Sequence, residues 1–360
     1  MLRRMTYLLV LFAAACIDPL KVDDKGKVRR VLVVDGLITN QPGPYHVRLF
    51  YSHQLKTGKL APFEPVRNSF VSIVDDAGNS FSLTETTPGL YETDADQLTG
   101  QIGSRYALNV RTDEDDEYTC NFQEMKPVGE IDQVYFDSGR SDQTDLSLGV
   151  YVDGKGEPGA ENLYRWRWIS IYKAEANPEL KVTPTPAGDI PTPEPCSGYR
   201  YMGGGLVKVG ECTCCFCWSY DYSDGAFVSK NTFVSESIFA NQFLGSVSVT
   251  PMHFFDKFYI EVQQLSLSQE AYDFWSLVEK QQKGANDIFQ PNAIKIKGNI
   301  RSVENSDVEV LGFFGVSGVA TSFRYVDRSE FPFEIPPPDT VPFSCLDYFK
   351  NPTTEEPTFW

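Results

Sequence analysis

Residues 163–172 read Leu-Tyr-Arg-Trp-Arg-Trp-Ile-Ser-Ile-Tyr and predict one long β-strand. Successive side chains of a strand point to opposite faces, so Tyr164, Trp166 and Trp168 share one face. Two tryptophans on one face can stack on a sugar ring, but aromatic rings in this pattern more often fill a core. We therefore expect this face to lie in the core of a β-rich domain.

The residues around this strand predict a larger antiparallel β-sandwich domain over residues 127–345. Further strands are expected at 131–136, 146–152, 254–264, 292–301 and 308–319. Residues 177–195, rich in Pro and Thr, predict an extended insertion without regular structure. Residues 346–360 predict an irregular tail.

One α-helix is expected in this domain, at about 268–283. Ser268 is a capping residue, and Gly284 is a residue type that often follows the last turn of a helix. Between them the apolar pattern changes from a period of two to the period of a helix. The apolar side would be formed by Ala271, Phe274, Trp275 and Val278.

Residues 28–126 predict a separate immunoglobulin-like β-sandwich, because short apolar runs alternate with polar turns. Three motifs in this range resemble a more specific domain type: the hairpin Asp75-Asp76-Ala77-Gly78, Gly89-x-Tyr91 and Tyr106-x-Leu108-x-Val110. They resemble the transthyretin-type or carboxypeptidase-regulatory-type domain. That resemblance implies a spacer or docking module without catalytic function. The whole chain is thus expected to be mainly β.

Composition agrees with a β-rich, acidic protein. Aromatic residues make up 13 %, and 27 glycines and 23 prolines supply many turns. The formal net charge is −17, and removal of residues 1–15 takes away Arg3 and Arg4 and no acid, which leaves about −19. Such a surface repels phosphate backbones, so nucleic acid is excluded as a partner.

Five consecutive acids occupy residues 113–117. Carboxylates can bind Ca²⁺, but the alternating ligand spacing of a calcium loop is absent from this run. Five like charges avoid burial, so a solvated hairpin tip is the favoured interpretation. Calcium remains the alternative.

The first sixteen residues are typical of a lipoprotein leader. Arg3 and Arg4 precede an apolar run that ends in Ala13-Ala14-Ala15, and Cys16 follows directly. The arrangement resembles a bacterial lipobox, in which the cysteine thiol is lipidated with acyl chains such as palmitate. We expect a signal peptide over 1–15, lipidation of Cys16 and a tether over 16–27. The alternative is an ordinary cleaved signal, since Ala13 replaces the usual leucine; the run is too short for a membrane-spanning helix.

Seven cysteines remain beside Cys16, and outside the cytosol we expect them to form disulfides, with at least one left unpaired. The disulfide candidates are Cys196, Cys212, Cys214, Cys215 and Cys217. Adjacent cysteines pair poorly, so Cys196 is expected to reach into the 212–217 cluster. Cysteines on opposite faces of a strand disfavour a shared metal, and no metal is predicted. Candidate ligand contacts are Tyr199, Tyr201 and Trp218.

No catalytic motif is recognisable, and we predict neither an enzyme nor a cofactor. The chain lacks a zinc-protease motif and a phosphate-binding glycine loop, and 315–319 does not form a nucleophile elbow. A pair of carboxylates among the 49 acids could still perform glycoside hydrolysis. A glycan-directed hydrolase is therefore the third interpretation.

A resemblance covers nearly the whole chain after the leader. The resemblance is based on the motifs Ile260-Glu261-Val262, Ser266-Leu267-Ser268-x-Glu270-Ala271-Tyr272-x-Phe274-Trp275, Gly298-Asn299-Ile300, Asn305 and Val310-Leu311-Gly312-Phe313-Phe314. They resemble an uncharacterised lipoprotein family of Bacteroidota-type outer membranes, the domain of unknown function 4249. The resemblance implies a lipid-anchored outer-membrane protein beside a TonB-dependent receptor, on the periplasmic or the outer side. An accessory role in nutrient uptake is the leading prediction, and cell-envelope adhesion or assembly is the alternative.

Overall fold

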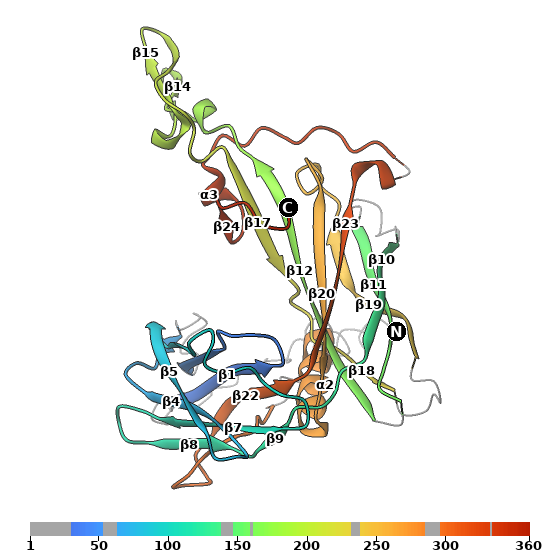
Figure 1. The fold of residues 1–360 in the computed structure, drawn as a ribbon. Helices are drawn as coiled ribbons and strands as arrows, with labels where there is room; N and C mark the ends of the chain where they lie inside the picture. The colour runs from blue at the N-terminus through green and yellow to red at the C-terminus, as the bar shows by residue number, and fades with distance from the viewer. Residues whose placement is uncertain are drawn as a thin grey trace, which may run out of the picture.

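The computed structural model describes residues 30–52, 63–137, 147–158, 161–231, 238–284, 296–331 and 333–360. The expected signal peptide, Cys16 and the tether lie outside these residues. The described chain is mainly β-strand with one long helix, which confirms the predicted fold class. Figure 1 shows a sandwich at one end of the molecule and an upright pair of sheets rising from it.

The sandwich is one eleven-stranded sheet, in the order β21-β8-β7-β4-β5-β6-β2-β1-β22, with β3 beside β2 and β9 beside β7. The sheet curves until its terminal strands β21 and β22 lie against each other. Its strands are β1 Val31–Thr39, β2 His46–Ser52, β3 Glu64–Pro65, β4 Phe70–Asp75, β5 Ser80–Thr87, β6 Leu90–Glu92, β7 Arg105–Arg111, β8 Glu117–Cys120, β9 Gln123–Glu124, β21 Ile300–Ser302 and β22 Val310–Ser317.

Alternate side chains of the strands point inward and form the core of this sandwich. In β1, Val34 and Ile38 are fully buried, whereas Asp35 is exposed on the opposite face. Two strands of this sheet, β21 and β22, come from residues that the sequence assigned to the second domain. β22 pairs in parallel with β1, and β21 pairs with β8. The first unit is therefore completed by residues 300–317, far beyond the expected boundary at 126.

The second unit packs two sheets face to face. One has the order β10-β11-β19 and the other β23-β20-β12-β17-β24, with β18 beside β12. The strands are β10 Glu130–Asp137, β11 Ser147–Lys155, β12 Asn162–Glu175, β17 Phe216–Tyr222, β18 Phe227–Asn231, β19 Ile238–Ser248, β20 Phe258–Ser266, β23 Val319–Val326 and β24 Pro352–Thr353. Short 3₁₀ turns follow at η1 Pro178–Leu180, η2 Pro195–Ser197 and η3 Arg328–Glu330.

The aromatic face of β12 lies in the core, as predicted. Tyr164, Trp166 and Trp168 are 1 %, 0 % and 8 % exposed. Each polar group of the two indoles is satisfied, since Trp166 Nε1 donates to Gln264 Oε1 at 3.0 Å and Trp168 Nε1 to the Leu244 carbonyl at 2.7 Å. The alternative of a sugar platform on this face is excluded by that burial.

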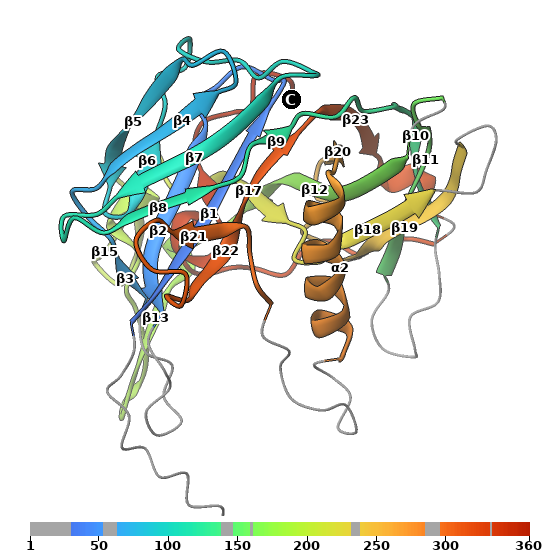
Figure 2. The same cartoon turned by 90° about the horizontal axis from the view of Figure 1, so that it is seen from below.

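The predicted helix is present as α2, Gln269–Gly284. Ser268 caps it, since its hydroxyl oxygen accepts from the Ala271 amide at 3.2 Å. The helix joins the two units: Phe274 stacks on Phe313 of β22 with ring centroids 4.8 Å apart, and Glu270 accepts from Gln123 of β9 at 2.7 Å. Figure 2 shows α2 in this corner, seen from below.

Two further expectations need revision. Residues 177–195 hold a regular hairpin of β13 Val182–Thr185 and β14 Gly188–Pro191, although their Pro and Thr content predicted irregular chain. The tail 346–360 includes most of the short helix α3, Cys345–Tyr348, and β24, which pairs with β17. Among the described residues, no helix combines the length and the apolar character needed to cross a membrane.

Candidate functional site

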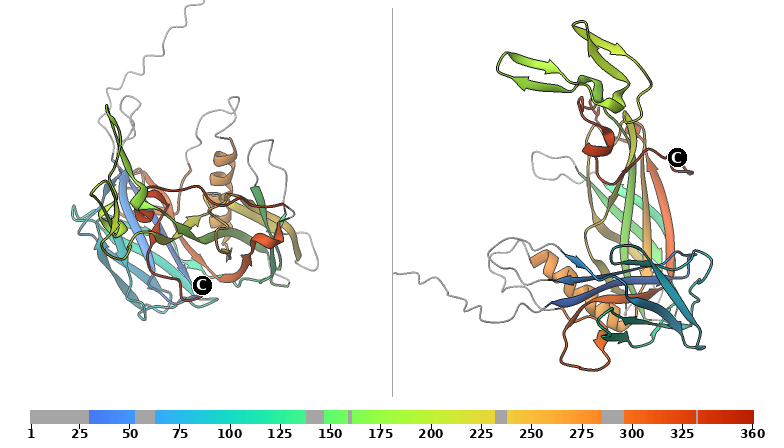
Figure 3. Two further views of the ribbon diagram at one scale, coloured as in Figure 1. Left: turned by 90° about the horizontal axis from the view of Figure 1, so that it is seen from above. Right: turned by 90° about the vertical axis from the view of Figure 1, so that its left-hand side faces the viewer.

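The most distinctive surface of the molecule is a head formed by residues 177–217. It carries the β13–β14 hairpin and a second hairpin of β15 Tyr199–Met202 and β16 Gly205–Lys208. Figure 1 and the right-hand view of Figure 3 show both hairpins projecting at the end of the molecule away from the first sandwich. The head interrupts the chain between β12 and β17, so two central strands of the upright sheet position it.

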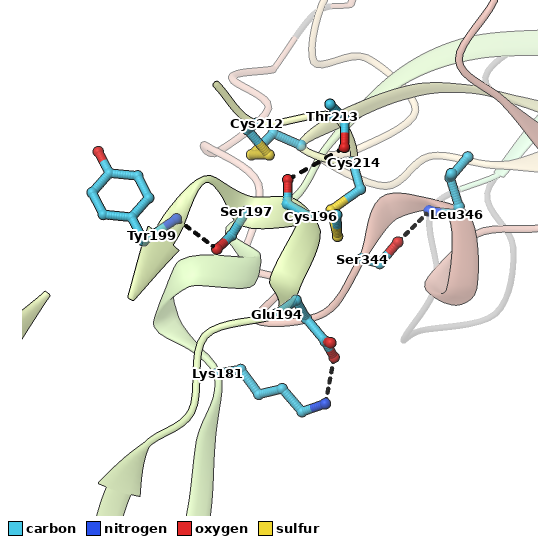
Figure 4. The surroundings of a disulfide bond; sticks show 11 residues. Lys181, Glu194, Cys196, Ser197, Tyr199, Cys212, Thr213, Cys214, Ser344 and Leu346 are labelled. Atoms are coloured by element: carbon cyan, nitrogen blue, oxygen red, sulfur yellow. Dashed lines mark hydrogen bonds and ion pairs between the residues drawn. A yellow bond between two sulfur atoms is a disulfide. The ribbon is translucent and has the colours of Figure 1, made fainter. Parts of the chain in front are cut away.

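Three disulfides brace the base of the head, which confirms the prediction of disulfide bonds. Cys196 pairs with Cys214, Cys212 with Cys215, and Cys217 with Cys345, with Cα–Cα distances of 5.7, 5.8 and 5.9 Å. Cys196 thus reaches into the 212–217 cluster, as the sequence indicated. Figure 4 shows the Cys196–Cys214 bond and its surroundings. In the described parts of the chain, no group of three or more His, Cys, Asp or Glu residues is arranged to hold a metal ion.

Hydrogen bonds hold the disulfide-linked segments in register. The Thr213 amide donates to the Cys196 carbonyl at 2.9 Å, and the Cys345 amide donates to the Cys214 carbonyl at 2.9 Å. Lys181 and Glu194 form an ion pair across the base of the first hairpin (Figure 4). Backbone bonds of this kind, combined with cross-links, restrict the conformations that the base of the head can adopt.

The second hairpin presents apolar side chains to solvent. Tyr201, Met202, Leu206 and Val207 are 43 %, 48 %, 38 % and 42 % exposed, and Tyr201 lies directly opposite Leu206 in the strand pair. We call these four residues the apolar hairpin. A turn at Gly203 and Gly204, both with positive φ, brings the two strands together. Tyr201 and Leu206 lie on one face of the hairpin, and Met202 and Val207 lie on the other. Exposed apolar side chains gathered on one element mark interaction surfaces in soluble domains.

The structure separates the three candidate contact residues. Tyr201 belongs to the apolar hairpin, whereas Tyr199 is half-buried beside a hollow of about 230 Å³ that Lys208, Glu211 and Phe216 also line. Trp218 is only 7 % exposed and packs with Ile171 and Tyr259 on the upright sheet. Tyr199 and Tyr201 therefore lie in the head, and Trp218 lies in the sheet below it.

Sequence reasoning missed Met202, Leu206 and Val207. Their signal was present, because two short alternating runs flank the glycines at 203 and 204 as in a hairpin. The sequence pattern predicts the hairpin, but it does not predict that the apolar side chains of both its strands are exposed to solvent.

The acidic run 113–117 lies at the turn between β7 and β8. Asp113, Glu114 and Asp115 are exposed, and the Thr112 amide closes the turn by donating to the Asp116 carbonyl at 3.0 Å. Glu114 lies 3.4 Å from the Arg30 guanidinium. The run thus occupies a solvated hairpin tip.

A comparison with protein families places the chain. The model of the domain of unknown function DUF4249 matches residues 17–322, which is most of the 360 residues. None of the curated proteins compared with the chain matches it. The matched region begins directly after Cys16 and covers the first sandwich, the head, α2 and the strands β21 and β22. The chain belongs to the DUF4249 family.

Proposed function

We propose that this protein is a non-enzymatic lipoprotein of Bacteroidota-type outer membranes that docks on a TonB-dependent receptor as an accessory component in nutrient uptake. The observation that carries the proposal is the disulfide-braced head with its exposed apolar hairpin. In this proposal Cys16 carries the lipid, the transthyretin-like sandwich is the spacer, and the head reaches the partner.

The physical chemistry of the head suits docking. Binding costs free energy when side chains and loops lose freedom, and a surface that is already rigid loses less. Tyr201 and Met202 are residue types enriched at protein interfaces. Lys208 and Glu211, paired at 3.0 Å, supply charged groups at the rim of this surface. An apolar centre with a polar rim is the usual anatomy of a reversible protein interface.

The test is a pull-down of the tagged protein from native outer membranes under mild detergent. The unmodified protein is expected to retain a stoichiometric β-barrel receptor. Tyr201→Lys combined with Leu206→Lys should reduce receptor recovery by about tenfold, because these directly opposed residues share one face of the hairpin and two charges would be buried at the interface. The matched control is Val303→Lys with Val308→Lys, two exposed valines of the first sandwich, which should leave recovery unchanged.

Two outcomes would overturn the proposal. Repeated absence of a receptor from the eluate removes the docking role. A stoichiometric envelope protein of another kind, lost with the same head substitutions, would instead favour the adhesion or assembly role.

A further inference from the structure

A groove of about 870 Å³ lies where α2 meets the outer face of the first sandwich. Strands β1, β2, β6 and β22 form its floor, and Phe274 and Trp275 of α2 form one wall. Figure 2 shows α2 on the side of the first sandwich where β22 lies. We call this space the junction groove. It lies apart from the head and is not used by the docking role.

The wall from α2 is aromatic and fixed in place. Phe274 stacks on Phe313 of the floor at 4.8 Å, and the Trp275 ring meets Phe274 edge-on at 5.1 Å. Arg165 of β12 lies behind Trp275, with its guanidinium carbon 3.5 Å from the indole centroid. A cation on one face of an indole attracts the ring and holds its orientation. Trp275 is thus positioned as one face of an apolar site.

The floor carries one exposed acid and one exposed base on neighbouring strands. Asp35 and Arg48 are directly opposite each other in the β1–β2 pair, and both line the groove and are exposed. Such cross-strand neighbours have Cβ atoms about 5 Å apart. Within the described ranges, neither side chain forms an ion pair, with the other or with a third residue.

The surroundings add positive charge to this pair. Arg165 is partly buried, and its enclosed Nε has no hydrogen-bond partner among the described residues. Burial, helped by repulsion from Arg167, lowers the pKa of Arg165 to about 10, while Asp35 acts in the opposite direction. Arg167 in turn donates to Gln263 at 2.7 Å. Burial lowers the pKa of Arg167, while the carboxylates of Asp35 and then Glu261 act in the opposite direction. A buried guanidinium without a direct carboxylate partner favours an anion nearby, and Asp35 is an anion that acts on both arginines.

We propose that the junction groove binds a free α-amino acid with an aromatic side chain. Its carboxylate pairs with Arg48, its ammonium with Asp35, and its ring packs on Trp275 and Phe274. An amino acid presents both charges within a few ångströms of each other, which matches two opposite charges on neighbouring strands. An apolar ring fills the aromatic part of the groove, as in most small-molecule sites.

The ligand series tests this on the unmodified protein by isothermal titration calorimetry. L-Phenylalanine is the probe. N-acetyl-L-phenylalanine lacks the ammonium and L-phenylalaninamide lacks the carboxylate, so each should bind at least about tenfold more weakly. These two compounds also stand for the ends of a peptide. Equal binding of either compound, or no heat with L-phenylalanine, L-tyrosine and L-tryptophan, would overturn the proposal.

Variants locate the site. Asp35→Asn and Arg48→Gln change exposed side chains only, and each should weaken L-phenylalanine binding by about tenfold or more. Asp339→Asn and Arg67→Gln alter an exposed acid and an exposed base elsewhere and should bind normally. Binding that survives in both groove variants places the amino acid elsewhere and contradicts the proposal. Because titration needs no receptor, its result is independent of the pull-down.

Discussion

Cys120 is the one cysteine of the described residues that lies outside the three disulfides. It is 4 % exposed at the end of β8, and its sulfur accepts a hydrogen bond from the Leu108 amide at 3.1 Å. Burial raises the pKa of this thiol to about 11. A thiol in this setting is protonated and enclosed, and both properties suppress its reaction with electrophiles.

Cys120 should therefore resist alkylation in the folded protein. At pH 9 a thiol with the ordinary pKa near 9 is about half ionised, whereas a pKa of about 11 leaves about 1 % as thiolate. Iodoacetamide followed by peptide mapping should leave Cys120 unmodified without denaturant and modify it in denaturant. Rapid modification of the folded protein would contradict the burial.

The same shift predicts a pH dependence of stability. Between the unfolded pKa near 9 and the folded pKa of about 11, the folded state holds a proton that the unfolded state has lost. Stability should thus fall as pH rises through this window, and less steeply in Cys120→Ala. Thermal unfolding at pH 8 to 11 measures the difference. If stability falls equally steeply with pH in the unmodified protein and in Cys120→Ala, the raised pKa of Cys120 is not the cause.

At this scale the sequence predicted the kind of chemistry but not all of the partners. An odd number of cysteines implies an unpaired thiol, and the spacing around Cys196 implies a local cross-link. The pairing of Cys217 with Cys345 spans 128 residues and depends on where α3 docks. Spacing carries no information about such a contact, because the chain between two cysteines can take many paths.

Among the elements, β22 shows most clearly how the two units are tied together. It lies in parallel beside β1, and Gly312 in this strand has a φ of +88°. A Cβ at this position would collide with the Val34 carbonyl oxygen of β1. Glycine is required there both for its backbone conformation and for the close approach of the strands.

Gly312→Ala should therefore destabilise the protein by about 3 kcal/mol or more, since it combines backbone strain with a steric clash. Gly78→Ala is the matched control, because Gly78 has a φ of +91° and a methyl group there would meet no other atom within 4 Å. It should cost about 1 kcal/mol from strain alone. Urea denaturation measures both, and similar losses would show that the contact with Val34 is unimportant.

The Cys217–Cys345 disulfide ties α3 to β17, and both cysteines are fully buried. Because it closes a long loop, the double variant Cys217→Ser/Cys345→Ser should lose about 3–5 kcal/mol of unfolding free energy. The variant Cys212→Ser/Cys215→Ser removes a disulfide between cysteines only three positions apart in the sequence. It should lose about 2 kcal/mol of unfolding free energy. Denaturation under non-reducing conditions compares them, and a larger loss in the second variant would contradict the loop argument.

Strand positions were largely readable from alternation, but strand partners were not. Residues 308–319 predict a strand, and β22 occupies most of this range. Alternation specifies which side chains face a core, not which core, so the return of β21 and β22 to the first sheet could not be predicted. The β13–β14 hairpin was missed because prolines at 184 and 191 disfavour strands in general, although a two-stranded edge tolerates them.

The whole molecule, as we propose it, has three parts: a lipid at Cys16, two β-units locked by α2 and β22, and a projecting head. The proposed anchor makes a simple prediction. Cys16→Ser should move the protein from the membrane pellet to the soluble fraction, because acyl chains would supply its membrane affinity. Fractionation with salt washing tests it, and a variant that remains in the pellet would contradict the lipoprotein assignment.

The central claim is that the head is the docking surface, and site-specific photo-crosslinking in intact cells tests it most directly. A photoreactive amino acid in place of Leu206 lies on the apolar hairpin, and one in place of Val303 lies on the first sandwich as the control. We expect a light-dependent adduct with a TonB-dependent receptor from position 206 and none from position 303. No adduct from 206, or the same adduct from both positions, would contradict the claim.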